Sequence, residues 1–117
     1  MTHKMQLNDS PFYSIWNNKK TIELRLFDEK RRSVSIDDTI VFSNRNEADK
    51  MISVKVIALH VFDSFETLYK TLPLEKCGYS KDALPKANAE DMNQYYSIEE
   101  QKKYGVVGIE FELISKR

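Results

Sequence analysis

The chain has 117 residues, of which 41% are hydrophobic and 31% are charged, so we expect one globular domain spanning residues 1–117. Lysine plus arginine number 18, as do aspartate plus glutamate, so no net positive charge attracts nucleic acid. Two histidines, one cysteine and three glycines exclude a disulfide framework, a Cys- or His-rich zinc site and a glycine-rich phosphate loop.

The first predicted element is a helix over residues 11–17. Ser10 is a suitable N-cap residue, and Pro11 suits the first helical position because its missing N–H is not needed there. Asn17 and Asn18 follow, and asparagine tolerates the left-handed conformation that ends a helix.

Several strands are predicted from two-residue periodicity. Residues 21–27 alternate between apolar and polar, residues 36–42 follow a polar turn, and residues 51–62 become apolar on both faces toward their end. Residues 28–32 are all charged and predict the tip of a hairpin between the first two strands. The last strand is predicted over residues 106–114.

Two short helices are predicted in the second half of the chain. Asp63 and Glu66 have capping-box spacing and open a helix over residues 63–72. Ser97 and Glu100 have the same spacing and open another helix. The segment between these helices is predicted to be irregular.

Strands that are short and joined by brief connections exclude a doubly wound sheet, which needs a long helix after each strand. We therefore predict an α+β domain. Its centre is a small, mostly antiparallel β-barrel, and short helices cover the ends of the barrel. We find no internal repeat and no domain boundary.

The most unusual local pattern lies around the strand predicted over residues 21–27. Lys20 precedes this strand, and Thr21, Glu23 and Arg25 share one of its faces, with successive Cα atoms about 6.6 Å apart. A carboxylate between two cations stays ionised and well oriented, which suits a ligand such as a nucleotide. The alternative is a solvated strand face, because ion pairs on protein surfaces are common.

The spacing Asn18-x-Lys20-x-x-Glu23-x-Arg25 resembles the G-x-K-x-x-E-x-R signature of the ASCH domain, a relative of the PUA-like fold. Asn18 replaces the glycine of the family, and asparagine is the next most tolerant residue at positive φ. Further stretches are similar to small stand-alone bacterial ASCH proteins: residues 3–8, 20–31, 62–65 and 95–110. The resemblance implies a PUA-like β-barrel with a cleft lined by the signature residues.

The resemblance also implies two kinds of activity. One is binding of RNA or of a nucleotide-like small molecule in the cleft. The other is hydrolysis of the amide of N(4)-acetylcytidine, for which Lys20 matches the catalytic lysine of some small members. Their nucleophilic threonine is replaced here by Glu23, which cannot form an acyl intermediate. Their acidic residue corresponds by position to Glu75.

Binding of single-stranded RNA or a nucleotide is our first hypothesis. Lys20 and Arg25 would hold phosphate or carbonyl oxygens, Glu23 would accept a hydrogen bond from an exocyclic amine, and Tyr96 would line the cleft. The alternative is a hydrolase acting on a modified nucleobase or on RNA, in which Glu23 or Glu75 activates water. A third possibility is an interaction protein whose strand face is incidental.

No apolar run reaches the length of a signal segment or a membrane span, so we expect no membrane partner. A single cysteine fits a reducing compartment, and we expect a cytoplasmic location. No residue pattern indicates a metal ion or a cofactor.

Overall fold

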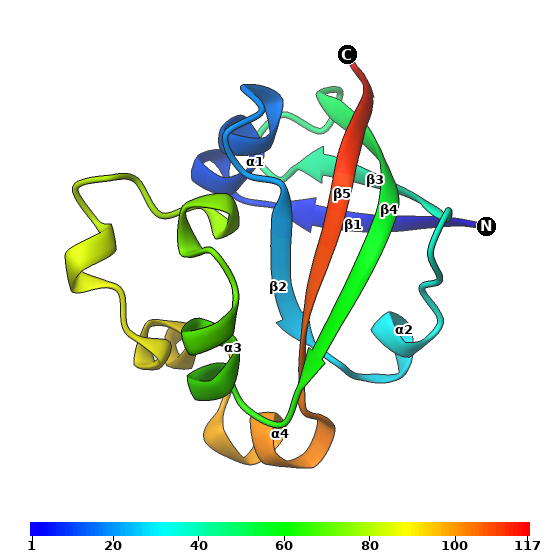
Figure 1. Ribbon diagram of the computed structural model, residues 1–117. Coiled ribbons are helices and arrows are strands. Elements are labelled where there is room, and N and C mark those ends of the chain that lie inside the picture. The colour runs from blue at the N-terminus through cyan, green and yellow to red at the C-terminus, as the bar shows by residue number, and fades with distance from the viewer.

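Five strands form one mixed sheet that curls into a half-barrel in the computed structural model, which describes residues 1–117 (Figure 1). The strands are β1 (Thr2–Leu7), β2 (Ile22–Leu26), β3 (Thr39–Asn44), β4 (Met51–Phe62) and β5 (Val106–Lys116). Their order in the sheet is β1-β3-β4-β5-β2, so β1 and β2 are the edges. Only the β1–β3 pair is parallel. The predicted α+β class and mostly antiparallel sheet are confirmed.

Short helices lie around the ends of the sheet (Figure 1). The α-helices are α1 (Asp9–Trp16), α2 (Glu29–Arg32), α3 (Phe65–Thr71) and α4 (Ile98–Tyr104). The segment predicted to be irregular contains three 3-10 helices, η1 (Leu74–Cys77), η2 (Leu84–Lys86) and η3 (Ala89–Gln94). No helix has both the length and the apolar character needed to cross a membrane.

The second capping box and the long strand are confirmed. The Ser97 side chain accepts from the backbone N–H of Glu100, and the Glu100 carboxylate accepts from that of Ser97. Helix α4 then ends at Gly105, whose φ is 72°. Strand β4 covers the predicted range 51–62.

The predicted hairpin over residues 28–32 is wrong. Strand β2 pairs with β5 rather than with β3. The charged residues instead form the one-turn helix α2, because the Asp28 side chain caps the N–H of Arg31. Strand β1 was not predicted, since its pairing with the distant strand β3 has no local signal.

Several element boundaries also differ from the prediction. Helix α1 begins at Asp9, so Pro11 lies inside its first turn and Ser10 is not the N-cap. Ser64, not Asp63, caps α3 with its side chain. Strand β3 begins only after Asp37, which has a φ of 76° and therefore interrupts the extended chain.

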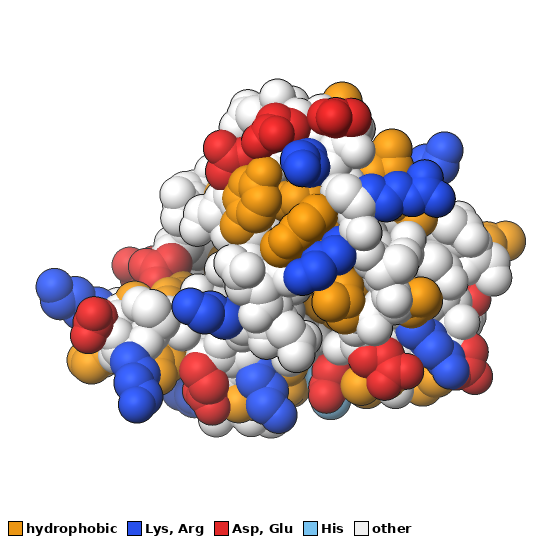
Figure 2. Space-filling view, turned by 90° about the horizontal axis from the view of Figure 1, so that it is seen from above, with side chains coloured by type: hydrophobic (Ala, Val, Ile, Leu, Met, Phe, Trp, Pro, Cys, Tyr) orange, Lys and Arg blue, Asp and Glu red, His pale blue; other side chains and the backbone are white.

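Charged groups of both signs share the face that carries α1 and the C-terminus (Figure 2). Cationic side chains there lie beside apolar ones. Trp16 illustrates such contacts, since the Nζ atoms of Lys50 and Lys116 lie 5.6 and 5.2 Å from its ring centroid. Positive and negative side chains are mixed on this face, so it is neither a basic nor an acidic patch.

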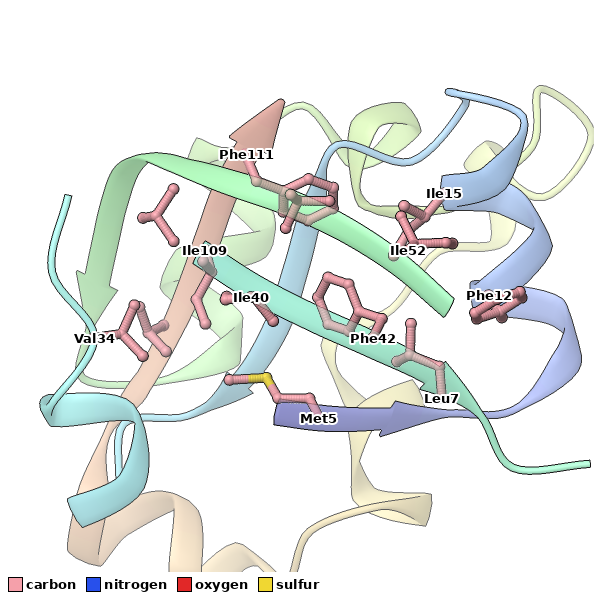
Figure 3. Packing of buried hydrophobic residues seen from close by; sticks show 13 residues of the cluster. Met5, Leu7, Phe12, Ile15, Val34, Ile40, Phe42, Ile52, Ile109 and Phe111 are labelled. Atoms are coloured by element: carbon pink, nitrogen blue, oxygen red, sulfur yellow. The ribbon is translucent and has the colours of Figure 1, made fainter. Parts of the chain in front are cut away.

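Apolar side chains from the strands and α1 fill the inside of the half-barrel (Figure 3). The largest buried members are Phe12, Phe42, Ile15, Ile40, Ile52 and Ile109. A second cluster joins β2 to α3 and to the 3-10 segment, and Ile22, Leu24 and Leu26 belong to it. The alternation of β2 therefore leaves Glu23 and Arg25 on its other face.

The Asp38 carboxylate ties β1 to the turn before β3. It accepts hydrogen bonds from His3 Nε2 at 2.8 Å, from the Ser35 N–H at 2.9 Å and from the N-terminal amine at 3.2 Å. The bond from His3, followed by the bond from Ser35, lowers the pKa of Asp38 to about 2.

This lowered pKa predicts a loss of stability in acid. The unfolded chain protonates Asp38 first as the pH falls, so the stabilisation is complete above about pH 4 and is lost as the pH approaches 2. Urea unfolding between pH 5 and pH 2 tests this expectation. The free energy of unfolding of Asp38→Asn should fall less steeply than that of the wild type. Parallel curves would contradict the assignment.

Candidate ligand-binding site

Glu23 lies on β2, and its carboxylate is held between two cations. Lys20 Nζ lies 2.7 Å from Glu23 Oε1, and Arg25 Nε donates to Glu23 Oε2 at 2.8 Å. The Glu23 side chain is only 5% exposed, and both cationic side chains are largely buried with it. The expected contact of Glu23 with these cations is therefore present.

The three groups keep one another ionised. Burial opposes the charged form of Glu23, but the charges of Lys20 and then Arg25 outweigh this effect and lower the pKa of the carboxyl. Burial likewise opposes the charge of Arg25, and the nearby Glu23 carboxylate raises its pKa overall. Each carboxylate oxygen contacts a cation and the carboxylate is buried, so this cluster faces a ligand mainly with N–H donors.

A sharp turn after α1 brings Lys20 into this cluster. Asn18 has a φ of 59°, which agrees with the expected replacement of glycine by asparagine at positive φ. The backbone N–H groups of Lys19 and Lys20 both donate to the Ser14 carbonyl, at 2.8 and 3.0 Å. This reversal of the chain directs Lys20 toward the sheet rather than toward solvent.

Gly78 leaves space for the Lys20 side chain. Its φ is 110°, a conformation that other residues rarely adopt. A Cβ atom at this position would lie 3.3 Å from Lys20 Cδ and 3.9 Å from Lys20 Nζ. The end of η1 therefore forms part of the wall around the ammonium group.

Arg25 also connects the two edges of the half-barrel. Its Nη2 donates to the backbone carbonyl of Gln6 on β1, at 3.1 Å. Lys30 on α2 makes a second such bond, from Nζ to the carbonyl of Lys4 at 2.8 Å. Side-chain donors thus replace strand pairing between β1 and β2.

The cluster faces a cavity of about 640 Å³, a size typical of small-molecule sites. Four cations and two carboxylates line this cavity together with four tyrosines, so the lining charge favours an anionic ligand. These residues are Lys20, Arg25, Arg31, Arg45, Glu23, Asp91, Tyr69, Tyr79, Tyr95 and Tyr96.

The other predicted site residues are divided between the cavity and the outside. Tyr96 lines the cavity, is half-buried, and stacks on Phe65 with ring centroids 6.2 Å apart. Thr21 instead lines a separate hollow beside Trp16. Glu75 is exposed on η1 and does not line the cavity.

Several lining residues were not predicted from the sequence. Arg45 follows β3, and Tyr79 and Asp91 come from the 3-10 segment, so no local spacing links them to Lys20. Cys77 also lines the cavity, but burial raises the pKa of its thiol to about 12 and keeps it protonated. No group of three histidine, cysteine or acidic side chains is placed to hold a metal ion.

The curled mixed sheet with its short helices is a PUA-like fold of the ASCH type. The chain belongs to the ASCH domain family, whose model matches residues 5–115. This family is generally associated with RNA binding or with hydrolase activity. No match is found among curated proteins.

Solved structures show the same fold. The hypothetical protein PH0355 is 34% identical with a TM-score of 0.79, over 97% of this chain and 100% of that one. Protein PF0455 from Pyrococcus furiosus is 32% identical with a TM-score of 0.72, over 98% and 99% of the two chains. The ASCH protein from Zymomonas mobilis, at 13% identity and a TM-score of 0.63 over 98% and 71%, shares the fold alone.

Replacing Glu23 tests the electrostatic account of this cluster. We expect Glu23→Gln to lower the free energy of unfolding by about 3–5 kcal/mol, because two buried cations lose their counter-charge. Urea titration at neutral pH measures this change. Glu66→Gln is the matched control, since its ion pair with Lys70 is about three-quarters exposed and should contribute less than about 1 kcal/mol. Equal effects of the two substitutions would refute this account.

Proposed function

We propose that the cavity binds a nucleotide, either free or as one unpaired nucleotide of single-stranded RNA. The observation that carries this proposal is the buried Lys20–Glu23–Arg25 cluster, which aims fixed donors into a cavity lined by tyrosines. We place the protein in the cytoplasm, where the free thiol of Cys77 stays reduced.

Lys20 and Arg25 retain donors for a ligand. An arginine has five N–H donors, and Arg25 uses one on Glu23 and one on the Gln6 carbonyl. A lysine ammonium has three, and Lys20 directs one toward Glu23. The remaining donors suit phosphate or carbonyl oxygens, and Glu23 holds them in place before a ligand arrives.

Two adjacent tyrosines supply aromatic surface for a base. Tyr96 is fixed against Phe65, whereas Tyr95 is 60% exposed at the cavity. Stacking of a base on an aromatic side chain contributes about 1–3 kcal/mol. Base stacking together with oxygen recognition accounts for a nucleotide better than for a simple anion.

Charge outside the cavity supports few additional phosphate contacts. The chain has no net charge, and both signs are interspersed on the face in Figure 2. Arg45 is exposed at the cavity and forms no ion pair, whereas Arg31 is paired with Asp28 at 3.1 Å. Binding should therefore depend on one or two bases rather than on a long stretch of backbone.

The hydrolase alternative needs a general base, and neither of the two glutamates that the sequence suggested for this role fits it. Glu23 has a lowered pKa and two cationic partners, so it is a poor proton acceptor at neutral pH. Glu75 lies outside the cavity. We therefore favour binding over hydrolysis.

Single-stranded RNA should bind and a perfect duplex should not, because the base edges of A-form RNA are closed off from the cavity. With two or three phosphate contacts, the log–log salt dependence should have a slope of about −1.5 to −2. Titration of a fluorescent single strand and its duplex at several salt concentrations measures both. Equal affinity for the two forms, or a slope steeper than about −4, would show that the protein binds the phosphate backbone of the RNA rather than a base.

The contribution of the cavity is tested by a matched pair of substitutions in the same titration. Arg45→Ala should flatten the salt slope by about 0.7, the value for one phosphate contact on a single strand. Lys102→Ala is the control, because Lys102 is exposed on α4 outside the cavity. If both variants behave alike, the cavity is not the binding site.

The protein should release little or no acetate from N(4)-acetylcytidine, because Glu23 stands where the related amidohydrolases have their nucleophilic threonine. Chromatography of the nucleoside after incubation with purified protein measures cytidine formation. Efficient turnover that disappears in Lys20→Ala would overturn this expectation and make the protein an enzyme.

A further inference from the structure

Asp91 is a second carboxylate of the cavity, and no cation neutralises it. It lies on η3 and is half-buried. The cavity also contains Lys20, Arg25, Arg31 and Arg45, yet Asp91 forms no ion pair with any of them. Lys20 and Arg25 therefore neutralise the Glu23 carboxylate, whereas the Asp91 carboxylate has no cationic partner.

One oxygen of Asp91 is fixed by the protein and the other is free. Tyr79 OH donates to Oδ2 at 2.7 Å, and the Asn88 N–H donates to the same oxygen at 3.2 Å. The Tyr79 hydroxyl also lies 2.6 Å from that of Tyr69, which holds it in place. Oδ1 has no hydrogen-bond partner within the protein.

The fixed geometry of Asp91 depends on the proton of Tyr79. Burial, followed by the hydrogen bonds to Tyr69 and Asp91, raises the pKa of Tyr79. The hydroxyl therefore remains a donor throughout the neutral and mildly alkaline range. Tyr79 acts through Asp91, as a positioning residue.

Glu23 is a poorer acceptor for a ligand than Asp91, since its side chain is only 5% exposed and each of its oxygens already contacts a cation. We propose that Asp91 Oδ1 selects the base, by accepting a hydrogen bond from the exocyclic amine of cytosine, adenine or guanine. This inference rests on the proposed nucleotide binding and deepens it. A carbonyl in place of the amine would set oxygen against an ionised oxygen, which is repulsive.

The wild-type protein tests this selection without any substitution. Cytidine and uridine 5′-monophosphates differ in an amine or a carbonyl at one ring position and in whether the adjacent ring nitrogen carries a proton, and adenosine and inosine 5′-monophosphates provide the matching purine pair. A hydrogen bond to a charged acceptor predicts about tenfold to hundredfold tighter binding of the amine-bearing member of each pair. Calorimetric titration of the four nucleotides measures both ratios.

Asp91→Asn should invert this preference. Tyr79 and the Asn88 N–H both donate to one position, so the amide oxygen must occupy it and the amide NH₂ must take the place of Oδ1. A donor then meets the ligand, and the uracil carbonyl is favoured over the cytosine amine. Tyr79→Phe should reduce the cytidine-to-uridine ratio without inverting it. Asp82→Asn, at an exposed turn outside the cavity, should leave the ratio unchanged.

The outcomes separate this inference from the proposed function. Equal binding of cytidine and uridine monophosphates by the wild type, with the same ratio in Asp91→Asn, would overturn the role of Asp91 and leave nucleotide binding intact. Absence of binding by all nucleotides and by single-stranded RNA would overturn both. If Asp91→Asn fails to fold, the wild-type ratios and Tyr79→Phe still decide between the outcomes.

Discussion

The buried carboxylate of Glu23 is the interaction on which the open side of this half-barrel depends. It neutralises Lys20, which arrives from the turn after α1, and Arg25, which reaches across to the Gln6 carbonyl on β1. The Glu23 carboxylate thus links the turn after α1, strand β2 and, through Arg25, strand β1. These side-chain contacts lie where a closed barrel would have hydrogen bonds between paired strands. A buried ion pair of this kind is costly to disrupt, because any missing member leaves an unbalanced charge.

The parts of the molecule that the sequence predicted well are those decided by neighbouring residues. The apolar pattern of β4 and the reciprocal Ser97–Glu100 cap need only a few adjacent positions, and both are present as expected. The contact of Glu23 with Lys20 and Arg25 was likewise predictable, since their two- and three-residue spacings place the groups together at the start of one strand.

The parts that the sequence could not predict depend on contacts between distant residues. The alternation of β2 is the same whether it pairs with β3 or with β5, so the pattern alone could not exclude a hairpin. Helix α2 was missed because its charged residues also suit an exposed turn. Arg45 and Asp91 line one cavity although they lie 46 positions apart in the sequence. No motif spacing links residues so far apart.

The strand order also has a consequence for how the chain acquires this site during synthesis. Leu26 pairs with Val106, so β2 finds its only strand partner 80 residues later. A ribosome adds about 5–20 residues per second, so β2 waits roughly 4–16 seconds for β5. During that interval the charged Glu23 and the apolar face of β2 have no sheet to join. The strand that carries the candidate site is therefore the one that waits longest for its partner in the sheet.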